Sequence, residues 1–163
     1  MFAQCTCGQV KLEATGEPLS CAVCYCDDCQ AGSRQLEALP GAGSLCEADG
    51  GTAYVLFRKD RVRMTSGAER LEDHKLGSAS ATSRTTATCC GSPMMMRFDD
   101  ARHWVCLYRA RVHGEAPPVQ MRICTKFRTA DAPFPTDVPA HAGYPAGFLG
   151  KLLVARVAML FGR

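Results

Sequence analysis

The cysteines of this chain fall into short, spaced groups that could hold metal ions. Nine of the eleven cysteines make up this pattern: Cys5 and Cys7, then Cys21, Cys24, Cys26 and Cys29, then Cys89 and Cys90, with Cys46 standing apart. Zinc is bound tetrahedrally in proteins, with zinc–sulfur distances of about 2.3 Å, and closely spaced cysteines meet that demand. The spacing therefore predicts one or two Zn²⁺ ions per chain.

The tightest group supplies three or four thiols from a single loop. If only Cys24, Cys26 and Cys29 bind, the ion keeps an open coordination position, as catalytic zinc does, and we favour this interpretation. If Cys21 also binds, four thiolates close the site and make it structural. Because thiolates favour soft partners, an open site of this kind suits a substrate thiol.

A second constellation joins Cys5 and Cys7 to Cys89 and Cys90. A glycine follows each of these two pairs, and glycine lets the backbone turn so that N–H groups point at sulfur. The two pairs are far apart in the chain. A metal held by both would therefore tie the first strand to the middle of the protein and contribute directly to folding.

Length and composition narrow the class of protein. The chain has 163 residues, 47% of them apolar, which indicates one domain with a real core. A net charge of +3 is too small to indicate nucleic-acid binding. A secreted disulfide scaffold is the competing interpretation. However, the eleven cysteines are an odd number, adjacent cysteines bridge poorly, and no signal peptide precedes Cys5. We therefore expect metal binding in the reducing cytoplasm.

Alternating and β-rich segments predict a mainly β protein. These segments are residues 9–15, 53–57, 61–65, 83–88, 94–98, 103–112 and 119–127. Segments 53–57 and 61–65 are expected to form a hairpin or two neighbouring strands, because a short polar link joins them. Segment 69–76 shows no clear period. Cys106 and Cys124 fall within predicted strands, where we expect them to be buried and inert.

The C-terminal region reads as a proline-rich extended segment, 131–146, followed by a helix, 147–163. This amphipathic helix is the only one that the sequence predicts convincingly. Its apolar face comprises Leu149, Leu153, Val154, Val157, Leu160 and Phe161. The helix is too short to span a bilayer, so we expect it to dock on the domain or on a second copy of the chain. Binding to a membrane surface is the less favoured alternative.

Three segments, CTCGQVKLEATGEP, CYCDDCQAGS and TATCCGSPM, occur in this order and carry a family resemblance. Together they resemble the glutathione-dependent formaldehyde-activating enzymes, a family that includes the centromere protein V domain. The resemblance spans roughly residues 3–112 and implies a β-tent of stacked antiparallel sheets with zinc knuckles. It also implies carbon–sulfur lyase activity, the reversible condensation of formaldehyde with glutathione to S-hydroxymethylglutathione.

The resemblance also implies a role for particular cysteines. Cys24, Cys26 and Cys29 match the ligands of a substrate-site zinc, whereas Cys5, Cys7 and Cys90 match three ligands of a structural zinc.

The sequence departs from the family pattern at two positions. Ala87 stands where the remaining structural cysteine usually lies, so the site uses the neighbouring Cys89 or is weakened or empty. Tyr25 replaces a histidine often found between the first two loop ligands. We therefore expect a divergent member of the family, whose substrate could differ.

The sequence leaves two functions open. The first is a zinc-dependent carbon–sulfur lyase acting on a small thiol adduct, with Arg34 and Arg97 available to hold the carboxylates of glutathione. The second is a non-catalytic zinc module that binds a protein or a membrane surface through its C-terminal helix. No catalytic residue is identified, since Asp27 and Asp28 are expected to be solvated loop residues or hydrogen-bond acceptors beside the metal ligands, with a general-base role as the less favoured alternative. We divide the chain into a zinc-binding β domain, residues 1–130, the extended segment 131–146 and the helix 147–163.

Overall fold

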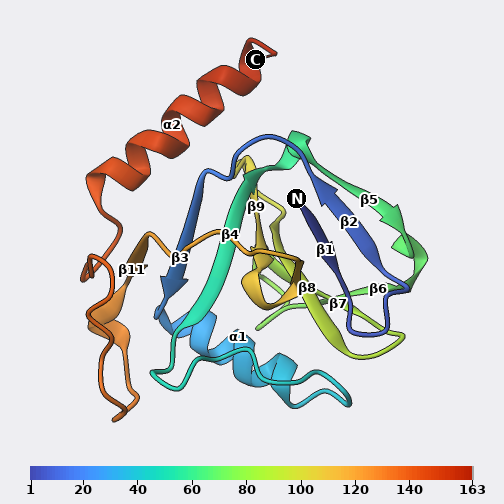
Figure 1. Cartoon of the computed structure of the whole chain (residues 1–163), viewed down its shortest axis with the longest axis horizontal. Helices are drawn as coiled ribbons and strands as arrows, with labels where there is room; N and C mark the ends of the chain where they lie inside the picture. Colours follow the sequence, from blue (N-terminus) through green and yellow to red (C-terminus); the bar gives the residue numbers. More distant parts are fainter. Residues whose placement is uncertain (163) are drawn as a thin grey trace.

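The computed structural model describes residues 1–162 and confirms a mainly β protein with a C-terminal helix (Figure 1). Arg163, the last residue of the predicted helix, lies outside the described residues. The two α-helices are α1, Asp27–Glu37, and α2, Ala146–Leu160. Four single 3₁₀ turns are η1 Lys59–Arg61, η2 Ala68–Arg70, η3 Arg109–Arg111 and η4 Thr125–Phe127.

The strands form two stacked sheets. The smaller sheet has the order β10-β1-β2-β5, with β1 Phe2–Gln4, β2 Lys11–Ala14, β5 Val62–Ser66 and β10 Val112–His113. The larger sheet has the order β11-β3-β4-β9-β8-β7-β6. Its strands are β3 Ser20–Cys24, β4 Thr52–Arg58, β6 Leu71–His74, β7 Thr82–Ala87, β8 Ser92–Phe98, β9 Trp104–Tyr108 and β11 Met121–Ile123. Pairing is antiparallel, as predicted, except that the edge strand β11 runs parallel to β3.

The larger sheet is covered on both faces. Along β4, Val55 and Phe57 point toward the smaller sheet and pack with Leu12. The alternate residues Tyr54 and Leu56 point to the other face, where they pack with residues of α1 and α2. Because successive side chains of a strand alternate between faces, this sheet separates two distinct apolar cores.

The structure corrects the expected pairing of the two strands in the middle of the chain. Strands β4 and β5 are not neighbours, because β4 pairs with β3 and β9 whereas β5 pairs with β2 in the other sheet. The turn η1 carries the chain from one sheet to the other. The short polar link therefore connects two different sheets. The local sequence does not distinguish such a connection from the turn of a hairpin.

Four of the described strands and α-helices were not predicted: β1, β3, α1 and β6. Helix α1 has the sequence DDCQAGSRQLE, with few apolar residues to set a helical period. Strand β6 is largely polar because it lies at the edge of the larger sheet and is half-exposed. Conversely, the segment 119–127 is a strand only over β11, since Cys124 takes a left-handed backbone conformation (φ 59°) and η4 follows.

Helix α2 buries a different face from the one predicted. Phe148, Leu152 and Ala155 are buried, whereas the predicted face is exposed, from 46% at Val157 to 76% at Phe161. The helix is apolar on nearly all sides, so the periodicity could not select the docking face. Phe148 and Leu152 of α2 belong to the core beside the larger sheet, and Figure 1 shows the C-terminal end of the helix far from both sheets. Within residues 1–162 no helix is long and apolar enough to cross a membrane.

Candidate metal centres

The first centre gathers the sulfurs of Cys5, Cys7, Cys89 and Cys90 within 4.8 Å of one another. Measured Sγ–Sγ distances are 3.5 Å for Cys5–Cys7, 3.8 Å for Cys5–Cys89, 3.3 Å for Cys7–Cys89 and 4.0 Å for Cys89–Cys90. Four sulfurs around a tetrahedral zinc, each about 2.3 Å from the ion, lie about 3.8 Å apart. The donor set and its spacing therefore fit a metal ion, and Cys89 supplies the sulfur that Ala87 cannot.

Backbone turns set the positions of these sulfurs. Gly91 has φ 69°, and a Cβ added there would lie 2.1 Å from the carbonyl oxygen of Pro40, so glycine is required. The backbone N–H of Val10 donates to Cys5 Sγ over 3.2 Å. Although desolvation raises the pKa of Cys90, hydrogen bonding from Ser92 and backbone N–H groups lowers it to about 6. Such donors favour the thiolate form that binds metal.

The second centre is built from one loop and the start of α1. Cys24 ends β3, Cys26 is the residue before α1, and Cys29 lies in the first turn, with all three sulfurs within 4.8 Å of one another. The helix N-terminus offers backbone N–H groups and a positive dipole, which favour thiolates. Hydrogen bonding with Cys24 and Cys29 lowers the pKa of Cys26 to about 3.

Cys21 does not join the second centre. It lies on the opposite face of β3 from Cys24, in the core between the two sheets, and its thiol donates to the carbonyl of Pro117 over 3.4 Å. Residues three apart on a strand point to opposite faces, which explains the separation.

Cys124 is the thiol near the second centre that the sequence did not connect to it. Hydrogen bonding with Cys24 lowers the pKa of Cys124 to about 7, against desolvation, and raises that of Cys24. The approach follows from the parallel register of β11 on β3, which pairs Ile123 with Cys24. Spacing alone could not reveal it, because Cys124 is remote in the chain. Its burial was predicted correctly, as was that of Cys106.

Buried polar contacts fix the loop of the second centre. The Tyr25 hydroxyl donates to Asp49 over 2.6 Å, and Arg122 donates to both groups. The Gln30 side-chain amide donates to the carbonyls of Tyr25 and Phe127 over 2.6 and 2.8 Å. Tyr25 thus braces the loop, pointing into a buried ionic network.

A cavity of about 330 Å³ opens beside the second centre, on the face of the larger sheet that α1 and α2 cover. Cys24, Cys26 and Cys29 line it at one place, and its remaining wall is mostly apolar. The hydroxyl of Tyr54, also in the wall, is buried without a hydrogen-bond partner among residues 1–162. Burial, followed by the nearby charge of Cys29, raises the pKa of Tyr54, so this hydroxyl stays protonated.

The arginines of the cavity are not the two that the sequence suggested. Arg97 forms an ion pair with Asp73 and donates to the Thr85 hydroxyl, and neither Arg97 nor the exposed Arg34 lines the cavity. Arg84 and Arg102 line it instead. Both lie in or beside β-strands, so their convergence depends on sheet register.

Arg84 crosses beneath the loop of the second centre. Its side chain is 1% exposed, and its Nη2 donates to the carbonyl of Asp28 over 2.5 Å. A Cβ added at Gly32 of α1 would lie 1.9 Å from Arg84 Nε, so the glycine leaves room for this arginine. The Nε and Nη1 atoms of Arg84 have no partner among residues 1–162.

The fold is a small β protein with two stacked sheets and two cysteine centres. Each centre could hold one metal ion, and the second centre lies beside a cavity. The chain belongs to the family of glutathione-dependent formaldehyde-activating enzymes, whose model matches residues 1–125. This match confirms the resemblance carried by the three cysteine motifs. No curated protein matches the chain significantly.

Among solved structures, the chain is similar to the crystal structure of a Rhodobacter sphaeroides protein from a structural genomics programme. The TM-score is 0.50 at 21% sequence identity, and the match covers 72% of this chain and 92% of that one. At this identity the similarity shows a shared fold.

Proposed function

We propose that the chain is a zinc-dependent carbon–sulfur lyase acting on a small thiol adduct, of which S-hydroxymethylglutathione is the example that its family suggests. The observation that carries this proposal is the second centre: three cysteines converge at the wall of a cavity large enough for a small molecule. We assign the first centre to a structural zinc, held by Cys5, Cys7, Cys89 and Cys90.

Cys24, Cys26 and Cys29 would hold the second zinc. When bound, zinc supplies a soft Lewis acid that favours a thiolate over a thiol in its open position. In the reaction, the carbon–sulfur bond of the adduct breaks, the adduct hydroxyl becomes the aldehyde carbonyl, and its proton passes to the released thiol. Thiol ligands of this kind are retained in a reducing compartment, so we propose a cytoplasmic location.

The chain offers groups for the proton and the oxygen in this reaction. Tyr54 presents a protonated, unpartnered hydroxyl that can donate to the adduct oxygen. Asp28 supplies the only carboxylate among the lining residues described, and we assign it the transfer of the proton. Asp28→Asn should therefore lower turnover while leaving thiol binding unchanged.

Calorimetry with glutathione tests the proposal on the zinc-loaded protein. Wild type should bind the thiol and Cys26→Ser should not, whereas Cys46→Ser should bind as wild type does because Cys46 lies apart from both centres. Formaldehyde should then be consumed only when thiol and wild-type protein are both present. Elemental analysis of the reduced protein should find one to two zinc ions per chain. A metal-free protein, or one that binds no thiol, contradicts the proposal.

The exposed face of α2 favours one alternative, a non-catalytic zinc module that associates with a second copy of the chain. Leu153, Val157 and Leu160 recur at helical spacing and are exposed by 66%, 46% and 71%. Such a stripe is typical of helix–helix contacts. Sedimentation should show a dimer that Leu153→Glu dissociates. A monomer that binds anionic vesicles would instead favour the membrane surface.

A further inference from the structure

We propose that the C-terminal segment shapes the cavity for a thiol adduct with an apolar body and a single carboxylate, in preference to glutathione. This inference rests on the lyase function proposed above and narrows its substrate class. Glutathione is polar along its length, carrying two carboxylates, an ammonium group and two amides, and the cavity offers few partners for them.

One apolar wall of the cavity comes from outside the region that matches the family. The match ends at residue 125, whereas Tyr144, Phe148, Leu149 and Leu152 line the cavity. Phe148 and Leu152 are 5% and 7% exposed and belong to the core that contains Cys24 and Cys29. The rings of Tyr144 and Phe148 stack with centroids 6.0 Å apart. Residues beyond the shared domain thus form one side of the site.

The opposite side of the cavity is apolar as well. Phe98 and Trp104 line it from β8 and β9, with ring centroids 5.7 Å apart in an edge-to-face arrangement, and Leu56 of β4 lies among them. A ligand between these two walls loses water over most of its surface. That transfer is favourable for hydrocarbon, at about 25 cal/mol per Å², and unfavourable for amides that find no partner.

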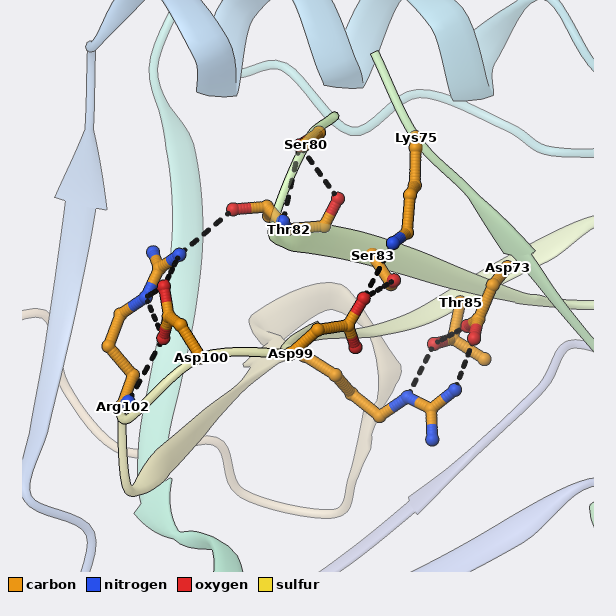
Figure 2. A network of polar contacts seen from close by, with 10 residues as sticks. Asp73, Lys75, Ser80, Thr82, Ser83, Thr85, Asp99, Asp100 and Arg102 are labelled. Carbon is orange, nitrogen blue, oxygen red and sulfur yellow. Dashed lines mark hydrogen bonds and ion pairs between the residues drawn. The ribbon is translucent and has the colours of Figure 1, made fainter. Parts of the chain in front are cut away.

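Two arginines, Arg102 and Arg84, are the cations among the described residues that line the cavity. Arg102 hydrogen-bonds through Nε and Nη2 to Asp100 and contacts the Thr82 hydroxyl (Figure 2). Its guanidinium also lies over the Phe98 ring, 3.7 Å from the ring centroid. Its charge is already balanced.

Arg84 is the other cation: its Nε lies against Gly32 of α1, and its Nη1 has no partner in the described part of the chain. A buried cation with open donors favours an anionic acceptor. The cavity therefore suits one carboxylate, held at Arg84, because Asp100 already balances the charge of Arg102.

Three thiols test the inference on the zinc-loaded wild-type protein. They are 4-(mercaptomethyl)benzoate, its uncharged amide and glutathione, each titrated by calorimetry. The benzoate should bind at least about tenfold more tightly than either of the others, the discrimination that one pocket contact can supply. Tighter binding of glutathione overturns the inference and leaves the proposed function standing. Equal binding of the amide overturns the role of Arg84, and failure of every thiol to bind overturns the proposed function itself.

Adjacent leucines of α2 provide the matched variants. Leu152 lines the cavity and is 7% exposed, whereas Leu153 is 66% exposed and does not line it. Leu152→Ala should weaken the benzoate by about tenfold and leave glutathione unchanged, while Leu153→Ala should change neither. Retained glutathione binding shows that the metal centre of each variant is intact. Equal affinities of both variants for the benzoate would mean that α2 is not a wall of the site.

Discussion

Both centres consist of cysteines, but the first takes its cysteines from remote segments of the chain and the second takes them from one short segment. The first draws Cys5 and Cys7 from the loop after β1 and Cys89 and Cys90 from the turn between β7 and β8, so it spans the two sheets. The second draws its three cysteines from a single loop and the first turn of α1, on the far face of the larger sheet.

Because the ligands of the first centre are far apart in the sequence and those of the second are close together, we expect the first centre to stabilise the fold and the second to serve the chemistry. A metal that joins remote segments closes a long loop, so its binding free energy becomes folding free energy. A metal held by neighbouring residues constrains little of the chain and contributes less to the fold. The locally built centre is also the one beside the cavity, so a metal ion held there would be within reach of a small molecule.

The largest effect is expected from Cys7→Ser. Loss of one sulfur from the centre that spans the sheets should lower the free energy of unfolding by several kcal/mol, because the clamp between sheets is lost. Denaturant unfolding of the zinc-loaded protein measures this, with Cys46→Ser as the control. A Cys7→Ser protein as stable as the control would mean that the first centre is not structural.

Gly32→Ala should have the next largest effect on stability, and its effect should be confined to the face of the larger sheet that carries the second centre and the cavity. The added methyl group would lie 1.9 Å from Arg84 Nε and force that buried side chain from beneath the loop of the second centre. Overpacking of this kind costs about 1–3 kcal/mol.

Gly150→Ala in α2 is the matched control for that substitution. A Cβ at this position meets nothing within 4 Å, so the alanine should stabilise the helix by about 0.5–1 kcal/mol. Thermal unfolding compares the two variants. If both substitutions shift stability in the same direction, Arg84 does not brace the loop as the structure shows.

Short-range features of the two centres could be predicted from the sequence, and long-range features could not. The spacing of Cys24, Cys26 and Cys29 places three thiols on one loop whatever fold surrounds them. By contrast, Arg84 reaches the cavity, and Cys124 reaches the second centre, only through strand register. The buried face of α2 depended on packing as well, because an evenly apolar helix contains no signal for its docking side.

Cys26→Ser should remove one metal ion per chain with little change in stability. The loop of the second centre is also held by the contacts of Tyr25 and Gln30, which remain when the metal is lost. The metal content per chain, measured by elemental analysis, should therefore fall by one ion, while the denaturation midpoint stays near that of wild type. A collapse of stability comparable to that of Cys7→Ser would erase the distinction between the two centres.

The smallest expected effect is a pH dependence on the cavity side, at His103. This side chain is 5% exposed, and its ring packs edge-to-face on Trp104 with centroids 5.0 Å apart. Burial lowers the pKa of His103, a backbone hydrogen bond with Leu152 of α2 opposes that shift, and Arg156, Lys59 and Arg58 lower the pKa further. Because the folded pKa lies below the unfolded value of about 6.5, the unfolded chain binds the proton more tightly. The free energy of unfolding is therefore unaffected by His103 above the unfolded-state pKa of about 6.5, and it decreases as the pH falls below that pKa.

His103→Gln removes this proton while keeping a polar side chain. The free energy of unfolding of wild type, relative to His103→Gln, should fall between pH 7.5 and 5.5, and titration of the cysteine centres cancels in that difference because both proteins contain them. A difference that grows in the opposite direction would mean that the folded protein stabilises the charged imidazole. The cations facing it from α2 and β4–η1 would then not govern its environment.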